Sequence, residues 1–153
     1  MKMPSEVEIA AVEDGLSAAG GVGEADTHLA TALRYLSDRE SPDYRDSIKE
    51  SISAVEAVVN AINGSKGTLG DALNKLDSKI DTHKALRDAF SKLYGYTNDA
   101  EGIRHALLEE PNLDQDDAKF MLVACAGFVN YLVSKAAASE IGATSWHGPS
   151  ARN

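Results

Sequence analysis

The chain has 153 residues, a length that suits one domain with one hydrophobic core. Hydrophobic residues make up 43% of it, which excludes a disordered polypeptide, and an aromatic content of 6% with only four prolines favours helices over strands. The net charge of −9 argues against broad binding to nucleic acid, because phosphate contacts need clustered lysine and arginine.

The first predicted helix follows Ser5, which forms a capping-box pattern with Glu8, three residues later. Gly20 and Gly21 predict its end. A second helix is expected within 25–40, where three leucines share one face at helical spacing: Leu29, Leu33 and Leu36.

The clearest helix starts at Ser41 and Pro42, with proline in the first turn, and stops at Asn63 and Gly64. Its apolar residues recur every three or four positions and form a stripe of about five turns. The stripe consists of Tyr44, Ile48, Ile52, Val55, Val59 and Ile62. We therefore expect this helix to lie at the centre of the fold.

Shorter helices are expected at 68–77, 82–96 and 98–110, with Gly95 breaking the chain between the last two. The residues of 82–96 expected to point inward are Leu86, Phe90, Leu93 and Tyr94. A last helix is expected over 114–139. Its acidic start suits the positive helix N-terminus, and Cys125 lies on its apolar stripe as a small buried residue.

The single cysteine, Cys125, excludes an internal disulfide and makes a reducing cytoplasm the expected location. The stretch MKMPSEVEIA lacks the apolar core of a signal peptide, and no apolar run reaches the roughly 18–20 residues that span a bilayer. We therefore expect no association with a membrane. Neither a metal nor a cofactor is expected, since no ligand cluster has metal-site spacing and no phosphate-binding glycine loop is present.

These elements predict an all-α, single-domain bundle of about six or seven helices over residues 1–139. Short connections and the absence of repeats indicate no internal domain boundary. Residues 140–153 have little periodicity and are expected to form a flexible C-terminal tail.

Four stretches of the chain resemble a helical module of bacterial abortive-infection proteins, described as AbiJ N-terminal-domain-like. They are LSDRESPDYRDSIKESISAVEAVVNAI, TLGDALNKL, HKALRDAFSKLYGYTNDAEGIRHALLEE and DAKFMLVACAGFVNYLVSK, and the resemblance covers roughly residues 29–135. It implies a HEPN-like up-and-down bundle that often dimerises, in a class with many metal-independent ribonucleases. The motif of that class is an arginine, four to six residues, then a histidine, and this chain departs from it, because none of its arginines precedes a histidine by that gap.

Arg104 and His105 are the first candidate catalytic residues. RNA cleavage through the 2′-hydroxyl needs a base near neutral pH, which histidine supplies, and a cation to hold the phosphate, which arginine supplies. Consecutive helix residues point about 100° apart, so a second surface such as another subunit must bring the substrate over both. The alternative is that Arg104 pairs with Glu50 or Glu56 while His105 lies at the surface.

His83 and Arg87 are the second candidate pair. They are four residues apart on one predicted helix, so their side chains converge, although in the reverse order of the HEPN motif. The alternative is a partly exposed polar face of that helix.

Arg45, Glu50 and Glu56 lie on the long central helix and predict a structural ion-pair network, because a buried charge must be paired. Tyr94 and Tyr96 are expected to fill the core beside a helix break rather than to stack on bases.

From the sequence we expect a helical interaction or dimerisation module of a bacterial phage-defence protein, without a standard catalytic motif. Its partner would be a second copy or an effector domain. The alternative is a metal-independent HEPN-type endoribonuclease that uses Arg104 and His105 on RNA. Sequence-specific binding to DNA is not expected from so acidic a chain.

Overall fold

The computed structural model describes residues 5–64, 69–76, 80, 82–98 and 113–138. These residues form helices and connecting turns without any strand, which confirms the predicted all-α bundle. The helices are α1 (Glu6–Ala19), α2 (Ala25–Ser37), α3 (Tyr44–Asn63), α4 (Leu69–Lys75), α5 (Lys84–Asn98) and α7 (Gln115–Ala138).

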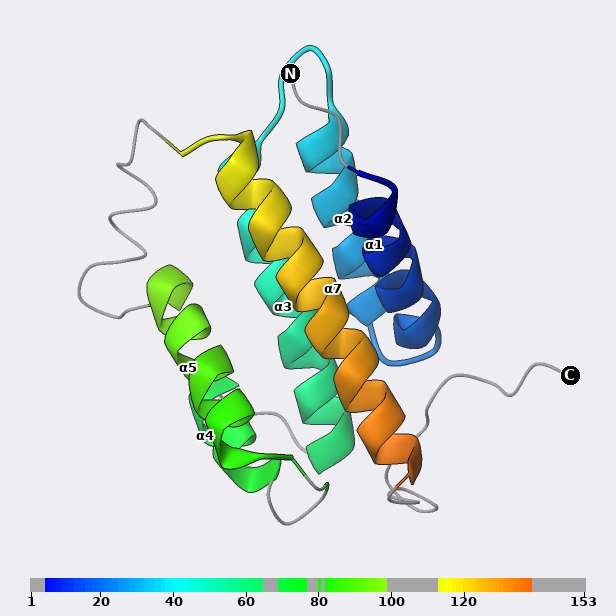
Figure 1. Ribbon diagram of the computed structural model, residues 1–153, viewed down its shortest axis with the longest axis vertical. Coiled ribbons are helices and arrows are strands. Elements are labelled where there is room, and N and C mark those ends of the chain that lie inside the picture. The colour runs from blue at the N-terminus through cyan, green and yellow to red at the C-terminus, as the bar shows by residue number, and fades with distance from the viewer. Residues whose placement is uncertain (1–4, 65–68, 77–79, 81, 99–112, 139–153) are drawn as a thin grey trace, which may run out of the picture.

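The two longest helices, α3 and α7, lie side by side at the centre of the bundle (Figure 1). α1 and α2 cover one side of this central pair, and α4 and α5 lie on the other. The predicted stripe of α3 is confirmed, because five of its six residues are buried and Tyr44 is half-buried against the core. α7 buries nine side chains, among them Cys125.

Local hydrogen bonds explain where these helices begin and end. The Ser5 hydroxyl accepts from the Glu8 N–H at 3.2 Å and the Glu8 carboxylate accepts from the Ser5 N–H at 2.8 Å, so the predicted capping box is confirmed. Asp114 and Asp117 make the same reciprocal pair at the start of α7. Gly64 ends α3 with φ = 69°, a left-handed conformation that favours glycine.

The start of α3 corrects the sequence prediction. The helix begins at Tyr44 rather than at Pro42, and the Asp43 carboxylate caps it by accepting from the Asp46 N–H at 3.0 Å. Aspartate is among the preferred residues at this position, because its carboxylate satisfies an N–H group that has no partner inside the helix.

Two predictions for α5 are wrong. Gly95 does not break the chain but lies inside α5, since one glycine costs a helix only about 1 kcal/mol relative to alanine. Leu86 is 48% exposed, whereas Arg87 beside it is 8% exposed and takes the inward position on the same face as Phe90. The buried face is therefore turned by one residue from the predicted one.

α1 and α7 run in the same direction and pack very closely. A Cβ atom at Gly15 would lie 2.7 Å from the Cβ atom and 2.7 Å from the carbonyl oxygen of Ala126. Only glycine fits at such a crossing, so this position sets the distance between the two helices. On the other side of α7, the ring of Phe128 stacks on Phe90 at 4.1 Å between centroids and thereby ties α5 to the bundle.

Two predictions about the organisation of the chain concern residues outside the described ones. They are the predicted helix at 98–110 beyond Asn98, and the flexible tail at 140–153.

Candidate interaction groove

The first candidate pair from the sequence, Arg104 and His105, lies outside the described residues. The second pair lies at the start of α5. His83 is exposed, and its ring nitrogen Nδ1 accepts from the Ala85 N–H at 3.0 Å, so it serves as a helix cap. Arg87 lies one turn further along and is buried. One member of the pair therefore faces solvent while the other is enclosed.

The charged residues of α3 make ionic contacts with two different partners. Glu50 lies 2.6 Å from Nδ1 of His28 on α2, with both side chains half-buried. The guanidinium of Arg45 lies 4.0 Å from Asp46, one residue along the same helix. Glu56 is half-buried and forms no ion pair within the described part of the chain. The contact made by Glu50 links α2 to α3, and the sequence had not indicated His28 as its partner.

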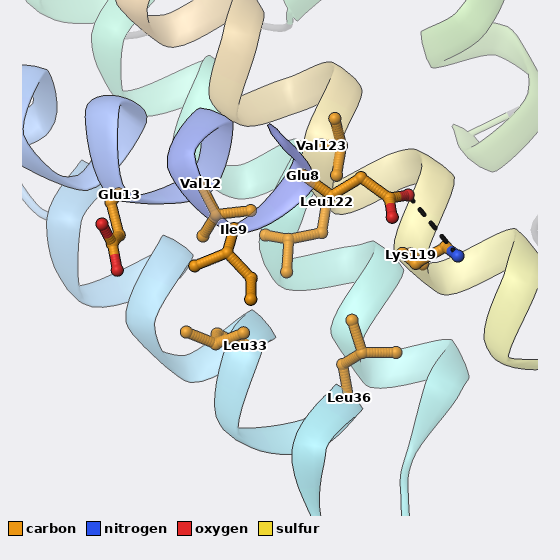
Figure 2. A pocket seen from close by; sticks show the side chains of 9 residues that line it. All are labelled: Glu8, Ile9, Val12, Glu13, Leu33, Leu36, Lys119, Leu122 and Val123. Atoms are coloured by element: carbon orange, nitrogen blue, oxygen red, sulfur yellow. Dashed lines mark ion pairs between the residues drawn. The ribbon is translucent and has the colours of Figure 1, made fainter. Parts of the chain in front are cut away.

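A groove that the sequence did not indicate opens where α1, α2 and α7 meet. It is lined mostly by apolar side chains: Ile9 and Val12 from α1, Leu33 and Leu36 from α2, and Leu122 and Val123 from α7. Figure 2 shows these side chains pointing toward one another, with the charged residues at the edges. We call this feature the α1–α2–α7 groove.

The groove stays open because these side chains only partly cover one another. Val12, Leu36 and Leu122 are buried, whereas Ile9 is 44% exposed. The cavity volume is about 80 Å³, well below the roughly 300–1,000 Å³ of typical small-molecule sites. The groove therefore has room for a single side chain rather than for a cofactor.

Apolar exposure continues along α7 beyond the groove. Phe120 is 61% exposed, and it is three residues from Val123, so the two are neighbours on one side of the helix. Large exposed apolar side chains next to an open groove are typical of surfaces that bind another molecule.

Two acidic side chains line the groove and two more lie near it by helix spacing, and we call these four residues, Glu6, Glu8, Glu13 and Asp116, the acidic rim. Glu8 and Glu13 line the groove itself. Glu6 lies three residues before Ile9, and Asp116 lies four residues before Phe120, so each shares a helix side with an exposed apolar residue.

The one lysine that lines the groove already has a partner, because Lys119 Nζ lies 3.4 Å from Glu8 Oε2. Figure 2 shows this pair on one side of the groove and Glu13 on the other. Hydrogen bonds from the Ser5 backbone and hydroxyl, with the nearby Lys119 ammonium, hold the pKa of the Glu8 carboxyl below its ordinary value of 4.5. Glu8 therefore stays charged at neutral pH.

The described residues contain no group of three or more histidine, cysteine, aspartate or glutamate side chains that could hold a metal ion. α7 is long and apolar enough to cross a membrane by length and composition, although its apolar run falls short of the length expected of a span from the sequence. The core helix of a soluble protein passes the same test, and nine side chains of α7 are buried against the other helices.

Comparison of the chain with family models, with curated proteins and with solved structures finds no significant match.

Proposed function

We propose that this chain is a helical interaction module of a bacterial phage-defence protein of the abortive-infection kind. It works in the cytoplasm, where it dimerises or holds an effector domain, and it carries no standard catalytic motif of its own. The observation that carries this proposal is the α1–α2–α7 groove, an apolar and partly exposed surface that suits a protein contact. The defence context and a HEPN-like character rest on the sequence resemblance over roughly residues 29–135.

The side chains of the second candidate pair also support an interaction role over catalysis. His83 is occupied as a helix cap, and Arg87 is enclosed in the bundle. A catalytic base and a phosphate-binding cation have to meet at one surface to act on the same substrate. The exposed groove is accordingly the better candidate for function among the described residues.

The test is a phage challenge of the source strain carrying variants of the chain. We expect Ile9→Lys, which places a charge on the edge of the groove, to lower protection against phage. Leu86→Lys is the matched control, since Leu86 is 48% exposed against 44% for Ile9 but lies on α5, outside the groove. Equal protection by the wild type and Ile9→Lys, with both proteins present at equal levels, would refute the proposal.

The alternative of a metal-independent endoribonuclease rests on the HEPN-like resemblance and is tested with the purified chain. RNA is incubated in the presence of a chelator with the wild type and with an Arg104→Ala, His105→Ala double variant of unchanged helical content. Cleavage by the wild type but not by the double variant would establish that the chain is a ribonuclease, and it would refute the proposal that the chain has no catalytic activity.

A further inference from the structure

We propose that the α1–α2–α7 groove binds a cationic segment of a partner protein that carries one large aliphatic side chain between lysines or arginines. This inference rests on the proposed function, because it names the chemistry of the partner that an interaction module would hold. Such a segment would contact two parts of the surface at once, with its aliphatic side chain on the apolar floor and its cations at the acidic rim.

The floor of the groove selects an aliphatic anchor. Val12, Leu36 and Leu122 close it from three different helices, and a volume of about 80 Å³ leaves room for one side chain between them. The floor holds no side-chain hydrogen-bond donor or acceptor to satisfy a polar anchor, because its lining between the charged edges consists of valine, leucine and isoleucine. Phe120, 61% exposed, adds apolar surface for the residues next to the anchor.

The rim selects positive charge next to that anchor. Two carboxylates, Glu8 and Glu13, line the groove, and the only lysine in the lining is engaged by Glu8 at 3.4 Å. Helix spacing places the other two carboxylates of the acidic rim beside exposed apolar residues. Glu13 is exposed and forms no ion pair with any described residue. A lysine or arginine of the partner would therefore meet an uncompensated carboxylate at one side of the groove, which strengthens association most at low salt.

Arg34 on α2, the residue after Leu33, does not neutralise the carboxylate of Glu13. The guanidinium of Arg34 lies over the ring of Tyr35, 5.1 Å from its centroid, and Arg34 is not part of the groove lining. It also follows Leu33 directly in the helix, so it points about 100° away from it.

The same charges disfavour the other occupants of such a surface. RNA and an anionic membrane would bring negative charge against the acidic rim. A second copy seated groove to groove would bring the Glu13 carboxylates of both copies, unpaired among the described residues, into one interface, because a two-fold interface brings the same patch together twice. A small apolar molecule would gain nothing from the rim.

The experiment measures binding of a labelled helical peptide of leucine and lysine to the full chain by fluorescence anisotropy. We expect saturable binding that weakens as salt rises. A peptide with glutamate in place of each lysine, and one with alanine in place of each leucine, should each bind at least about tenfold more weakly. RNA and anionic vesicles serve as competitors, and neither should displace the peptide. Sedimentation tests a second copy as the occupant, and the wild type and Ile9→Lys should show the same oligomeric state.

Four variants separate the groove from a general attraction to an acidic protein. Ile9→Lys and Glu13→Lys should each weaken binding about tenfold or more, since both residues line the groove. Glu24→Lys makes the same charge change at the far end of α2, on an exposed side chain, and should leave the affinity within about twofold. Leu86→Lys is the control for the apolar position. Circular dichroism checks that all four variants keep the helical content of the wild type.

Several outcomes would overturn the inference. They are absence of saturable binding, equal weakening by Glu13→Lys and Glu24→Lys, displacement of the peptide by RNA or by vesicles, and self-association of the wild type that Ile9→Lys abolishes. If Ile9→Lys abolishes phage protection while the peptide fails to bind, the interaction module stands and only the partner chemistry is wrong. If the peptide binds as expected and Ile9→Lys leaves phage protection intact, the partner chemistry stands and the defence role is wrong.

Discussion

Replacing Gly15 by alanine tests the close contact between α1 and α7. In an ordinary helix interior this change stabilises by about 0.8–1 kcal/mol, because glycine is the poorer helix former. At Gly15 the new Cβ atom would lie 2.7 Å from the Ala126 Cβ, 2.7 Å from its carbonyl oxygen and 2.9 Å from its Cα. Two of these atoms belong to the backbone, so no rotation of a side chain relieves the overlap and α1 has to move away from α7.

The size of the effect follows from those two opposing terms. Overpacking a tight core costs about 1–3 kcal/mol, and three contacts below 3.0 Å place Gly15→Ala at the upper end of that range. Subtracting the gain in helix propensity leaves a net loss of about 2 kcal/mol in the free energy of unfolding. Chemical denaturation followed by circular dichroism measures this loss as a lower midpoint at an unchanged slope.

A second glycine provides the matched control. Gly127 lies on the exposed side of α7, next to Ala126, and a Cβ atom there would have no neighbour within 4 Å. We expect Gly127→Ala to stabilise the chain by about 0.8–1 kcal/mol. If Gly15→Ala also raised the midpoint, the close approach of α1 and α7 would be refuted.

Three further predictions concern caps and ionisable groups. Ser5→Ala removes the hydroxyl that accepts from Glu8, and should cost about 1 kcal/mol in chemical denaturation, whereas Ser5→Asp should keep most of the stability. The pKa of Glu8 is lowered in the folded chain, so its charged carboxylate stabilises the fold above the ordinary pKa of 4.5. This stabilisation is lost as the pH falls through the lower pKa of the folded chain. The difference in stability between the wild type and Glu8→Gln should therefore vanish in acid. Burial raises the pKa of the Cys125 thiol to about 12, so iodoacetamide at neutral pH should leave the native chain unmodified and label it rapidly in denaturant, as followed by mass spectrometry. Labelling of native Cys125 at the rate of a small thiol would contradict its burial.

Helix ends were predictable because they depend on residues close in sequence. Ser5 and Glu8 bond each other across one turn, and Gly64 adopts a left-handed conformation that few other residues tolerate. The first residue of α3 was not predicted correctly, because proline and aspartate are both common at helix starts. Only the hydrogen bond that Asp43 accepts shows which of the two lies at the N-cap.

The orientation of α5 was not predictable from hydrophobicity alone. The pattern favoured Leu86 as an inward residue over the arginine next to it, yet the bundle encloses Arg87 and exposes the leucine. The long aliphatic stem of arginine can pack against apolar neighbours, so hydropathy underestimates how well it fits such a position. Tertiary packing around Phe90 determines the rotation of the helix.

The groove itself could not be read from the sequence, because it exists only between three helices. Leu33 was predicted to be inward, and it is half-buried with its exposed part lining the groove. Val123 on α7 is also half-buried and lines the groove with its exposed part. Ile9 and Phe120 are large apolar residues exposed at or beside the groove, but Val7 and Leu86 are exposed as well, so such residues do not by themselves locate it.

The crossing of α1 with α7 joins the first and the last of the described helices, and this sets the order in which the chain can fold. α2 and α3 are consecutive, and the Ser47 hydroxyl donates to the Ala32 carbonyl oxygen at 2.7 Å, so this hairpin can form from local contacts alone. α1 also packs against α2, but Gly15 cannot dock on Ala126 before α7 has been made. On the ribosome the packing of α1 is therefore completed only after α7 has emerged. The groove is among the last parts of the surface to be completed, so a truncated product cannot compete with the finished protein for its partner.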